Sequence, residues 1–436
     1  MPAKAYDWRD LVSPKVGLVR SLSPQIRGSE EPRPPHLYTA TLSHFDFRLV
    51  DKQERLAAGK GRTEEEAKAS AIGEAVERYC AYHWDPRKTF LRKLDDLQLP
   101  AITPTDCVLY SDEQYATPDW RYHRWDPAAE VTWLKGVELP GGGDVALPAS
   151  LVYLIHPVPR PEDFFTASTS NGLAAGPSLS AAVLSGLSEL MERDALLITW
   201  MNRLPTVELE IADEGSGAAA VRRHYGRSGV EVRAFLMRTD LPSSVVLAMA
   251  LDEDPQRPAT LIGMGCDLDP SVALDKAVFE LCQARPSESK RYLDAPPKGR
   301  LERYEDVKEL EDHPAFLCLP ERRREFEFLW SQGEKARPAD LPNPATGDAE
   351  RDLQICAQAL AERGYRVAYY DLTTADVASC GYHVARAIAP GLQPIHFGWG
   401  QERLGGRRLF ELPQALGLAP SPRTPLDLNP CPHPLA

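Results

Sequence analysis

Residues 178–193 read SLSAAVLSGLSELMER, and the same template occurs three times along the chain. The other two copies are TEEEAKASAIGEAVER at residues 63–78 and DPSVALDKAVFELCQA at residues 269–284. In each copy a residue that can cap a helix stands eleven positions before a glutamate, an alanine stands seven positions before it, and Glu or Gln stands three after it. The repetition predicts three helices of matched geometry.

Each copy begins as a helix begins. Thr63, Ser178 and Asp269 can accept hydrogen bonds from the first free amides. Thr63 also forms a capping box with Glu66, and Pro270 suits a first helical position.

In every copy an apolar stripe opposes an acidic one. In the first copy the apolar stripe consists of Ile72, Val76 and Tyr79. The opposing stripe consists of Ala67, Ser70, Glu74, Glu77 and Arg78. A single such helix is most simply a surface helix with i,i+4 ion pairs worth roughly 0.2–0.5 kcal/mol each, but three matched copies indicate a shared site.

A glycine-bearing turn is expected before each helix, at Gly59-Lys60-Gly61, residues 171–176 and Gly263-Met264-Gly265. Glycine lets backbone approach a ligand closely, and helix starts attract phosphate. Carboxylates that converge from separate helices repel each other unless a cation lies between them, and Mg²⁺ binds a few carboxylates together with substrate phosphates. The pattern therefore predicts a site for ATP with Mg²⁺.

The three motifs resemble the nucleotide-binding motifs of YcaO-domain enzymes rather than a glycine-rich Walker loop. The residues that carry this resemblance are Gly59-Lys60-Gly61, Ser70, Glu74, Glu77 and Arg78; Asn171-Gly172, Gly176, Glu189, Glu192, Arg193 and Asp194; and Glu280, Gln283 and Arg285. Residues 371–374 (DLTT), 390–394 (PGLQP) and 429–434 (NPCPHP) are similar to the azoline-forming branch, the cyclodehydratases of thiazole/oxazole-modified peptides. The resemblance covers nearly the whole chain. It implies a mixed α/β, YcaO-like fold of mainly antiparallel sheets flanked by helices, in which the three capped helices line the ATP and Mg²⁺ site.

The resemblance also implies a reaction, the ATP-dependent cyclodehydration of Cys, Ser and Thr residues in a ribosomally made precursor peptide to thiazoline or (methyl)oxazoline. The side chain attacks the preceding carbonyl, and ATP phosphorylates the oxygen that must leave. The expected Mg²⁺ ligands are Glu74, Glu77, Glu189, Glu192 and Glu280. The expected nucleotide contacts are Lys60, Ser70, Arg78, Arg193, Gln283 and Arg285. The sequence does not divide these side chains between metal and phosphate, and an alternative role for the arginines is to hold the glutamates in place.

The C-terminal tail is rich in proline, which enforces an extended conformation that can enter a groove. A disordered terminus is the simpler alternative. In the resembling branch a terminal Pro-x-Pro-x-Pro is linked to the active site, where the terminal carboxylate assists proton transfer. The resemblance thus assigns a catalytic role to Pro430, Pro432, Pro434 and Ala436, and it predicts that a C-terminal tag is damaging.

One position departs from the family pattern, because Ala181 stands where a glutamate is common, eight positions before Glu189. A lost carboxylate means one fewer metal contact, a shifted metal or a weaker ATP site. One alternative is therefore a noncatalytic partner that binds peptide or nucleotide within a modification complex. The other is a YcaO enzyme that activates a peptide carbonyl for sulfide or another nucleophile and forms a thioamide or amidine. The tail favours azoline formation over that second alternative.

Composition sets the outer limits. The chain has 436 residues, 43% of them hydrophobic, so it can bury a large core, and its net charge of −13 argues against nucleic acid as a partner. Eight cysteines without a Cys-x-x-Cys pair or zinc spacing fit reduced thiols in a cytosol. No apolar run approaches the ~20 residues of a membrane helix, so a cytoplasmic protein without membrane contact is expected. Cys80, Cys266 and Cys282 are expected to pack as small apolar groups, and His396 and His433 to be ordinary surface or core residues.

The organisation along the chain predicts an N-terminal segment, residues 1–58, packed on or preceding a catalytic domain that spans residues 59–436. Strands are expected at residues 36–42, 230–237, 244–251 and 365–371, with a helix at 352–363. Residues 335–350 are expected to form an exposed loop.

No segment reads as a module that binds a leader peptide. The resemblance therefore implies a separate ThiF-like partner, related to ubiquitin-activating enzymes, that captures the leader of the precursor. It further implies a flavin dehydrogenase that oxidises azolines, and self-association as a homodimer.

Overall fold

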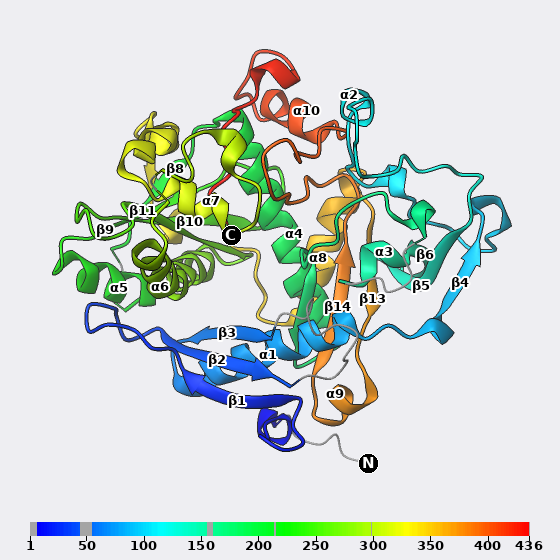
Figure 1. Ribbon diagram of the computed structural model, residues 1–436, viewed down its shortest axis with the longest axis horizontal. Helices are drawn as coiled ribbons and strands as arrows, with labels where there is room; N and C mark the ends of the chain where they lie inside the picture. The colour runs from blue at the N-terminus through cyan, green and yellow to red at the C-terminus, as the bar shows by residue number, and fades with distance from the viewer. Residues whose placement is uncertain (1–6, 44–54, 155–159, 213–214, 298, 436) are drawn as a thin grey trace.

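Each of the three predicted helices follows a β-strand, and we call each such pair a strand–helix unit (Figure 1). The computed structural model describes residues 7–43, 55–154, 160–212, 215–297 and 299–435. The units are β3 (Leu56–Gly61) with α1 (Glu64–Tyr82), β7 (Leu173–Gly176) with α4 (Leu179–Asn202), and β11 (Thr260–Asp267) with α6 (Pro270–Asp294).

The predicted helix caps are confirmed. The Thr63 hydroxyl accepts a hydrogen bond from the Glu66 amide at 3.2 Å, and the Glu66 carboxylate completes the capping box. The Ser178 hydroxyl accepts from the Ala181 amide at 3.2 Å, and Asp269 accepts from the amides of residues 271 and 272. These side chains satisfy amides that a helix leaves without a partner at its start.

The three units belong to three different sheets. The first sheet has the order β1 (Val19–Pro24), β2 (His36–Leu42), β3. The second has the order β4 (Thr89–Arg92), β5 (Val131–Leu139), β13 (Val367–Asp371), β14 (His383–Ile388), β7, and β6 (Gly143–Pro148) also pairs with β5. The third has the order β11, β10 (Ser244–Leu251), β9 (Glu231–Leu236), β8 (Val207–Leu209), β12 (Lys335–Ala336). Neighbouring named strands run antiparallel except β8 and β12, so the predicted mixed α/β class with mainly antiparallel sheets is confirmed.

The glycines that were expected to form turns lie within strands in two of the three units. A Cβ on Gly59 would overlap the backbone nitrogen of Ala71, and a Cβ on Gly263 would overlap that of Leu281. Both glycines therefore let a strand lie directly against its own helix. The prediction that these glycines form turns is wrong for β3 and β11. In the middle unit Gly172, with a φ of 91°, does occupy a turn before β7.

The largest core surrounds α4, which packs against β7, β14, α8 (Ala349–Glu362) and α10 (Arg408–Ala415) (Figure 1). Smaller cores lie around α1 and between α6 and α5 (Gly217–Gly226). Four short helices complete the set of α-helices in the described residues: α2 (Asp112–Tyr115), α3 (Ala149–Val152), α7 (Asp312–Leu317) and α9 (Ala375–Ser379). Cys80, Cys266 and Cys282 are buried free thiols in these cores, as predicted.

Most of the other local predictions agree with the structure. Strands β2 and β10 have the predicted bounds, and β9, β13 and α8 are shifted by one to three residues. Residues 335–350 are largely exposed, although they contain the short β12 and the start of α8. Strand β3 crosses the boundary predicted after residue 58, so the N-terminal segment contributes to the first sheet. No helix within the described ranges combines the length and the apolar character that a membrane span requires.

Candidate functional site

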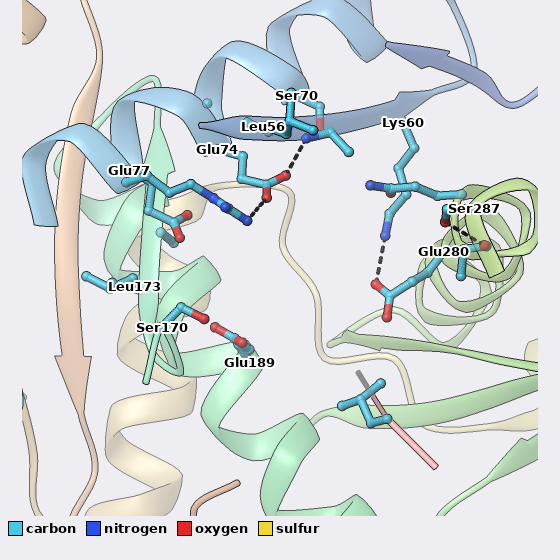
Figure 2. A pocket seen from close by; sticks show the side chains of 18 of the residues that line it. Leu56, Lys60, Ser70, Glu74, Glu77, Ser170, Leu173, Glu189, Glu280 and Ser287 are labelled. Carbon is cyan, nitrogen blue, oxygen red and sulfur yellow. Dashed lines mark hydrogen bonds and ion pairs between the residues drawn. The ribbon is translucent and has the colours of Figure 1, made fainter. Parts of the chain in front are cut away.

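A cavity of about 1170 Å³ lies where the three strand–helix units meet. Figure 2 shows Glu74 and Glu77 of α1 and Glu189 of α4 on one side of this space, and Lys60 of β3 and Glu280 of α6 on the other. The side chains point into the same opening. We call it the nucleotide cavity, after the ligand that the sequence motifs predict for it.

The glutamate that stands eleven positions after each helix cap makes the same contact in all three units. One carboxylate oxygen accepts a hydrogen bond from a backbone amide in, or directly before, the strand of its own unit. The three bonds join Ala58 N to Glu74 Oε2 at 2.9 Å, Gly172 N to Glu189 Oε2 at 3.0 Å, and Met264 N to Glu280 Oε1 at 3.3 Å. This contact fixes each carboxylate over its strand and leaves the second oxygen for the cavity.

The second oxygen of each of these glutamates pairs with a basic side chain. Glu74 Oε1 lies 2.5 Å from Arg78 Nη2, Glu189 Oε1 lies 3.5 Å from Arg193 Nη2, and Glu280 Oε2 lies 2.7 Å from Lys60 Nζ. The second arginine also reaches Glu192, with Nη1 to Oε1 at 3.0 Å. Cations are therefore present between the converging carboxylates, but they are side chains of the protein. Arg78 and Arg193 thus hold glutamates in place, which is the alternative role that the sequence leaves open for the arginines.

Burial and mutual repulsion shape the protonation of this acidic group. Burial, together with Glu189 and Glu74, raises the pKa of Glu77 well above its ordinary value. Burial and the nearby Glu280 and Glu189 raise the pKa of Glu192 to about 7, against the opposing effect of Arg193. Although burial also acts on Glu280, Lys60 and Arg193 outweigh it and lower the pKa of that carboxyl. The site thus holds both charged and proton-bearing carboxyl groups near neutral pH.

The donor set fits a nucleotide that brings its own phosphate oxygens to Mg²⁺. Within the part of the chain that the structure describes, no three His, Cys, Asp or Glu side chains form a group that could hold a metal ion. Mg²⁺ typically takes one or two carboxylates together with waters and substrate phosphates, and lysine and arginine bind phosphate. A cavity lined by spaced glutamates and basic side chains meets both requirements.

The family model for YcaO cyclodehydratases, described as ATP- and Mg²⁺-binding, matches residues 58–393. This chain belongs to the YcaO family. ATP and Mg²⁺ are therefore the cofactors of this YcaO chain. An uncharacterized protein of Methanothermobacter thermautotrophicus is 30% identical over 357 residues, which is 80% of this chain and 84% of the relative.

Solved structures share the fold of this YcaO chain. A heterocyclase in complex with substrate and cofactor is 26% identical with a TM-score of 0.79, and the match covers 98% of this chain and 56% of the heterocyclase. The YcaO protein of Methanopyrus kandleri, bound with AMPPCP and Mg²⁺, is 24% identical with a TM-score of 0.62, and the match covers 86% of this chain and 86% of that protein. The YcaO chain thus spans about half of the heterocyclase that it matches, namely 56% of the length of that protein.

Most of the residues that sequence reasoning assigned to metal or nucleotide line the nucleotide cavity. They are Lys60, Ser70, Glu74, Glu77, Arg78, Glu189, Arg193, Glu280 and Gln283. Glu192 does not line it; the residue is 8% exposed and its carboxylate pairs with the guanidinium of Arg193. Glu192 therefore affects the cavity through its ion pair with Arg193, which does line the cavity.

Arg285 lies outside the nucleotide cavity, contrary to the phosphate contact expected from the sequence. It is buried and forms ion pairs with Glu31 and with Asp252, the latter at 2.8 Å, and it stacks on the ring of Tyr225. Five positions after Glu280, it projects from a different side of α6, since each residue advances a helix by about 100°. The motif spacing therefore placed Arg285 correctly on the helix but on the wrong face for phosphate.

The C-terminal tail of the YcaO chain docks against the nucleotide cavity and is not disordered within residues 429–435. In Figure 1 it runs from α10 toward the centre of the molecule. The backbone amide of Asn429 donates to Met201 O at 2.6 Å, and the Trp200 indole donates to Cys431 O at 2.8 Å. Of the residues assigned to the tail, Pro434 lines the cavity, Pro430 and Pro432 do not, and Ala436 lies outside the described residues.

Three buried histidines hold the end of the tail. His313 Nδ1 donates to His433 O at 2.9 Å, and its Nε2 accepts from the Gly398 amide at 2.9 Å. His433 Nε2 lies 2.6 Å from His396 O. His396 and His433 are thus buried core residues that position the tail.

Sequence reasoning missed two residues that the structure brings to the site. Leu435 lines the nucleotide cavity beside Pro434. Arg386 of β14 is buried outside the cavity lining, where it interacts with the charges of Glu189 and Glu77; burial lowers the pKa of its guanidinium to about 10 against their opposing effect. Arg386 belongs to no helix motif, and only its inward register on a buried strand could have indicated it.

Proposed function

We propose that this YcaO chain catalyses ATP-dependent cyclodehydration of Cys, Ser or Thr residues in a ribosomally made peptide, giving thiazoline or (methyl)oxazoline. The observation that carries the proposal is the convergence of three matched strand–helix units on one cavity that the C-terminal tail also lines. Family membership and the likeness to a heterocyclase bound to substrate and cofactor support it.

The proposed reaction has two parts. The sulfur or oxygen of the substrate side chain bonds to the carbon of the preceding carbonyl and loses its proton, which gives a five-membered hemiorthoamide. The former carbonyl oxygen takes the γ-phosphoryl group of ATP, and its bond to carbon then breaks as the ring nitrogen loses its proton. The peptide loses one water per ring, and ATP becomes ADP and phosphate.

The proposed roles of the side chains follow from their positions. Glu74, Glu189 and Glu280 are anchored by backbone amides, so each can present its second oxygen to Mg²⁺ or to a water on it. Mg²⁺, when bound, would neutralise phosphate charge. Release from these glutamates would free Lys60, Arg78 and Arg193 to bind phosphate oxygens, and Ser70 and Gln283 would complete the polar wall. Pro434 and Leu435 would bring the terminal carboxylate of Ala436 to the peptide, where it would assist proton transfer.

We also propose partners from the same family resemblance. A precursor peptide with a leader and a Cys/Ser/Thr-rich core is the substrate, and a ThiF-like protein related to ubiquitin-activating enzymes captures the leader. A flavin dehydrogenase oxidises the azolines, and the YcaO chain forms a homodimer in the cytoplasm. The chain matches about half of the heterocyclase (56%), and a partner would supply what the unmatched half contributes there.

The test follows peptide mass and phosphate together. The untagged chain is incubated with ATP, Mg²⁺, a Cys/Ser/Thr-rich peptide and its ThiF-like partner. Stepwise losses of about 18 Da per ring, matched by phosphate release and abolished in Glu189→Ala, are expected because removing an anchored carboxylate disrupts phosphoryl transfer. An unchanged mass after verified peptide binding would contradict the proposal.

The same experiment separates the two alternatives. A thioamide-forming enzyme would add about 16 Da per site, and a noncatalytic partner would change neither mass nor phosphate. Ala181, the one residue that favours the noncatalytic alternative, does not line the nucleotide cavity, and the anchored carboxylates of all three units are present without it. This arrangement supports an active enzyme.

A further inference from the structure

A second cavity lies beside the nucleotide cavity, and the two share a wall. The second cavity has a volume of about 560 Å³. Phe397 lines both cavities, and Ser170 lines the nucleotide cavity while Ser168 and Thr169 line the second one. The docked tail is adjacent, because the ring of His433 packs 6.1 Å from that of Phe397. We call the second space the Arg403 cavity.

Arg403 is a buried cation without an acidic partner. The residue is 5% exposed, its Nε has no hydrogen-bond partner, and its guanidinium forms no ion pair with any residue that the structure describes. It lies over the ring of Tyr110, 5.0 Å from the ring centre, and this contact offsets only part of the cost of removing a charge from water. Buried charges in proteins are ordinarily paired, so an anion is the missing component.

A second buried polar atom belongs to the same cavity. His396 is 5% exposed and lines the Arg403 cavity, and its Nδ1 has no hydrogen-bond partner. Part of the wall is aromatic: Tyr122 stacks on Tyr110 with ring centres 5.0 Å apart, and Trp399, 43% exposed, also lines the cavity. A buried cation, a polar nitrogen and aromatic faces suit a carboxylate carried on a peptide.

The charges at the outer part of the cavity balance one another. Glu305 and Glu309 line it together with Arg121 and Lys308, and all four are exposed. The buried Arg403 therefore sets the preference of the interior for an anion, because exposed charges are largely screened by water and salt.

We propose that the Arg403 cavity binds a carboxylate of the substrate peptide, close in sequence to the residue that is cyclised. The inference rests on the proposed function, which places the reacting carbonyl in the nucleotide cavity across Phe397. The carboxylate accepts hydrogen bonds from Arg403, and the flanking peptide packs on the aromatic wall. An acidic side chain and a free C-terminus carry the same chemistry, so the test includes both.

The test measures binding by the fluorescence of Trp399, which requires no turnover. Three peptides are compared on the intact chain: acetyl-GCGEG-amide, acetyl-GCGQG-amide, and acetyl-GCGQG with a free C-terminal carboxylate. At least about tenfold tighter binding of the first peptide than of the second is expected, as for a hydrogen bond to a charged group. Tighter binding of the third peptide identifies a terminal carboxylate as the ligand.

Variants connect this preference to the cavity. Arg403→Gln should abolish the difference between the peptides, whereas Arg121→Gln, which removes an exposed charge from the same cavity, should preserve it. Trp399→Phe should remove the signal. Equal affinities on the unmodified protein, or a preference that survives Arg403→Gln, would overturn the inference. The peptide series uses the unmodified chain, so it tests the inference even if the Arg403→Gln variant fails to fold.

The outcome separates this inference from the proposed reaction. Acid-selective binding without ATP-dependent loss of water would support the cavity and contradict azoline formation. Loss of water with equal affinities for the peptides would contradict the cavity alone.

Discussion

At the scale of single residues, the glutamates of the site each perform two tasks. Glu280 uses one oxygen to accept the Met264 amide and the other to bind Lys60, which is 220 positions away in the sequence. Glu74 and Glu189 repeat this division with Arg78 and Arg193. Under the proposed roles, the anchoring bond would keep the carboxylate in place while the basic partner turns to phosphate, so the cavity would be pre-arranged for a nucleotide.

Lys60→Gln tests this division of tasks. The variant should bind ATP with Mg²⁺ roughly 10- to 100-fold more weakly, since a hydrogen bond to a charged group contributes about 1.5–3 kcal/mol. Titration calorimetry measures the affinity. Lys135→Gln is the matched control, because Lys135 pairs with Asp144 on the surface at 3.0 Å. Equal ATP affinity in the two variants would contradict a phosphate role for Lys60.

At the scale of elements, the structure is built from strands pressed against the helices that follow them. Glycine at the contact removes the side chain that would separate the two backbones. The close contact is what allows the carboxylate of a helix to reach a strand amide in the same unit. Packing within each unit thus determines the geometry of the site.

Gly263→Ala should lower the free energy of unfolding by about 1–3 kcal/mol, because its Cβ has no room beside the backbone of Leu281. Urea denaturation measures the change. Gly143→Ala is the control, since a Cβ there meets no atom within 4 Å. An equal effect of both substitutions would show that the close strand–helix contact does not matter.

The docked tail should loosen in acid. Burial lowers the pKa of His313 to about 4, whereas an unfolded histidine titrates near 6.5. The stabilisation is fully present above pH ~6.5 and is lost as the pH falls toward 4, because the proton added at Nε2 breaks the bond from Gly398. Hydrogen exchange should therefore show declining protection of residues 429–435 between pH 6.5 and 4.5. His313→Gln should reduce this dependence, although burial also lowers the pKa of His396 and His433, which remain in the variant. An unchanged slope in the variant would exclude His313 as a contributor.

At the scale of the whole molecule, buried ion pairs join the N-terminal segment to the catalytic body. Glu31 pairs with Arg285 of α6 and also accepts a hydrogen bond from Tyr225 of α5. Arg285 in turn binds Asp252 at 2.8 Å. These contacts fix the segment before residue 59 to α6 of the β11–α6 unit. The same segment continues into β3 of the β3–α1 unit.

Arg285→Met should destabilise the chain by roughly 3–5 kcal/mol, because it removes the ion-pair partner of the buried Glu31 and one of the two arginines, Arg285 and Arg257, that pair with the buried Asp252. The ATP affinity of the folded variant should equal that of the native protein. Denaturation and nucleotide titration are compared with Lys290→Met, a substitution of an exposed lysine on the same helix. Normal stability with lost ATP binding would restore the phosphate role inferred from the motif.

The sequence by itself determined the three capped helices, their acidic faces and the family, because caps, periodicity and motif spacing act over a few turns of chain. It also placed most of the site residues, since these lie within the motifs. Only the tertiary structure decided that Arg285 lies outside the nucleotide cavity, that the charge of Arg386 acts on the acidic group, and that residues 429–435 dock beside α4. These outcomes depend on contacts between segments far apart in the sequence, and local patterns carry no information about which face meets which partner.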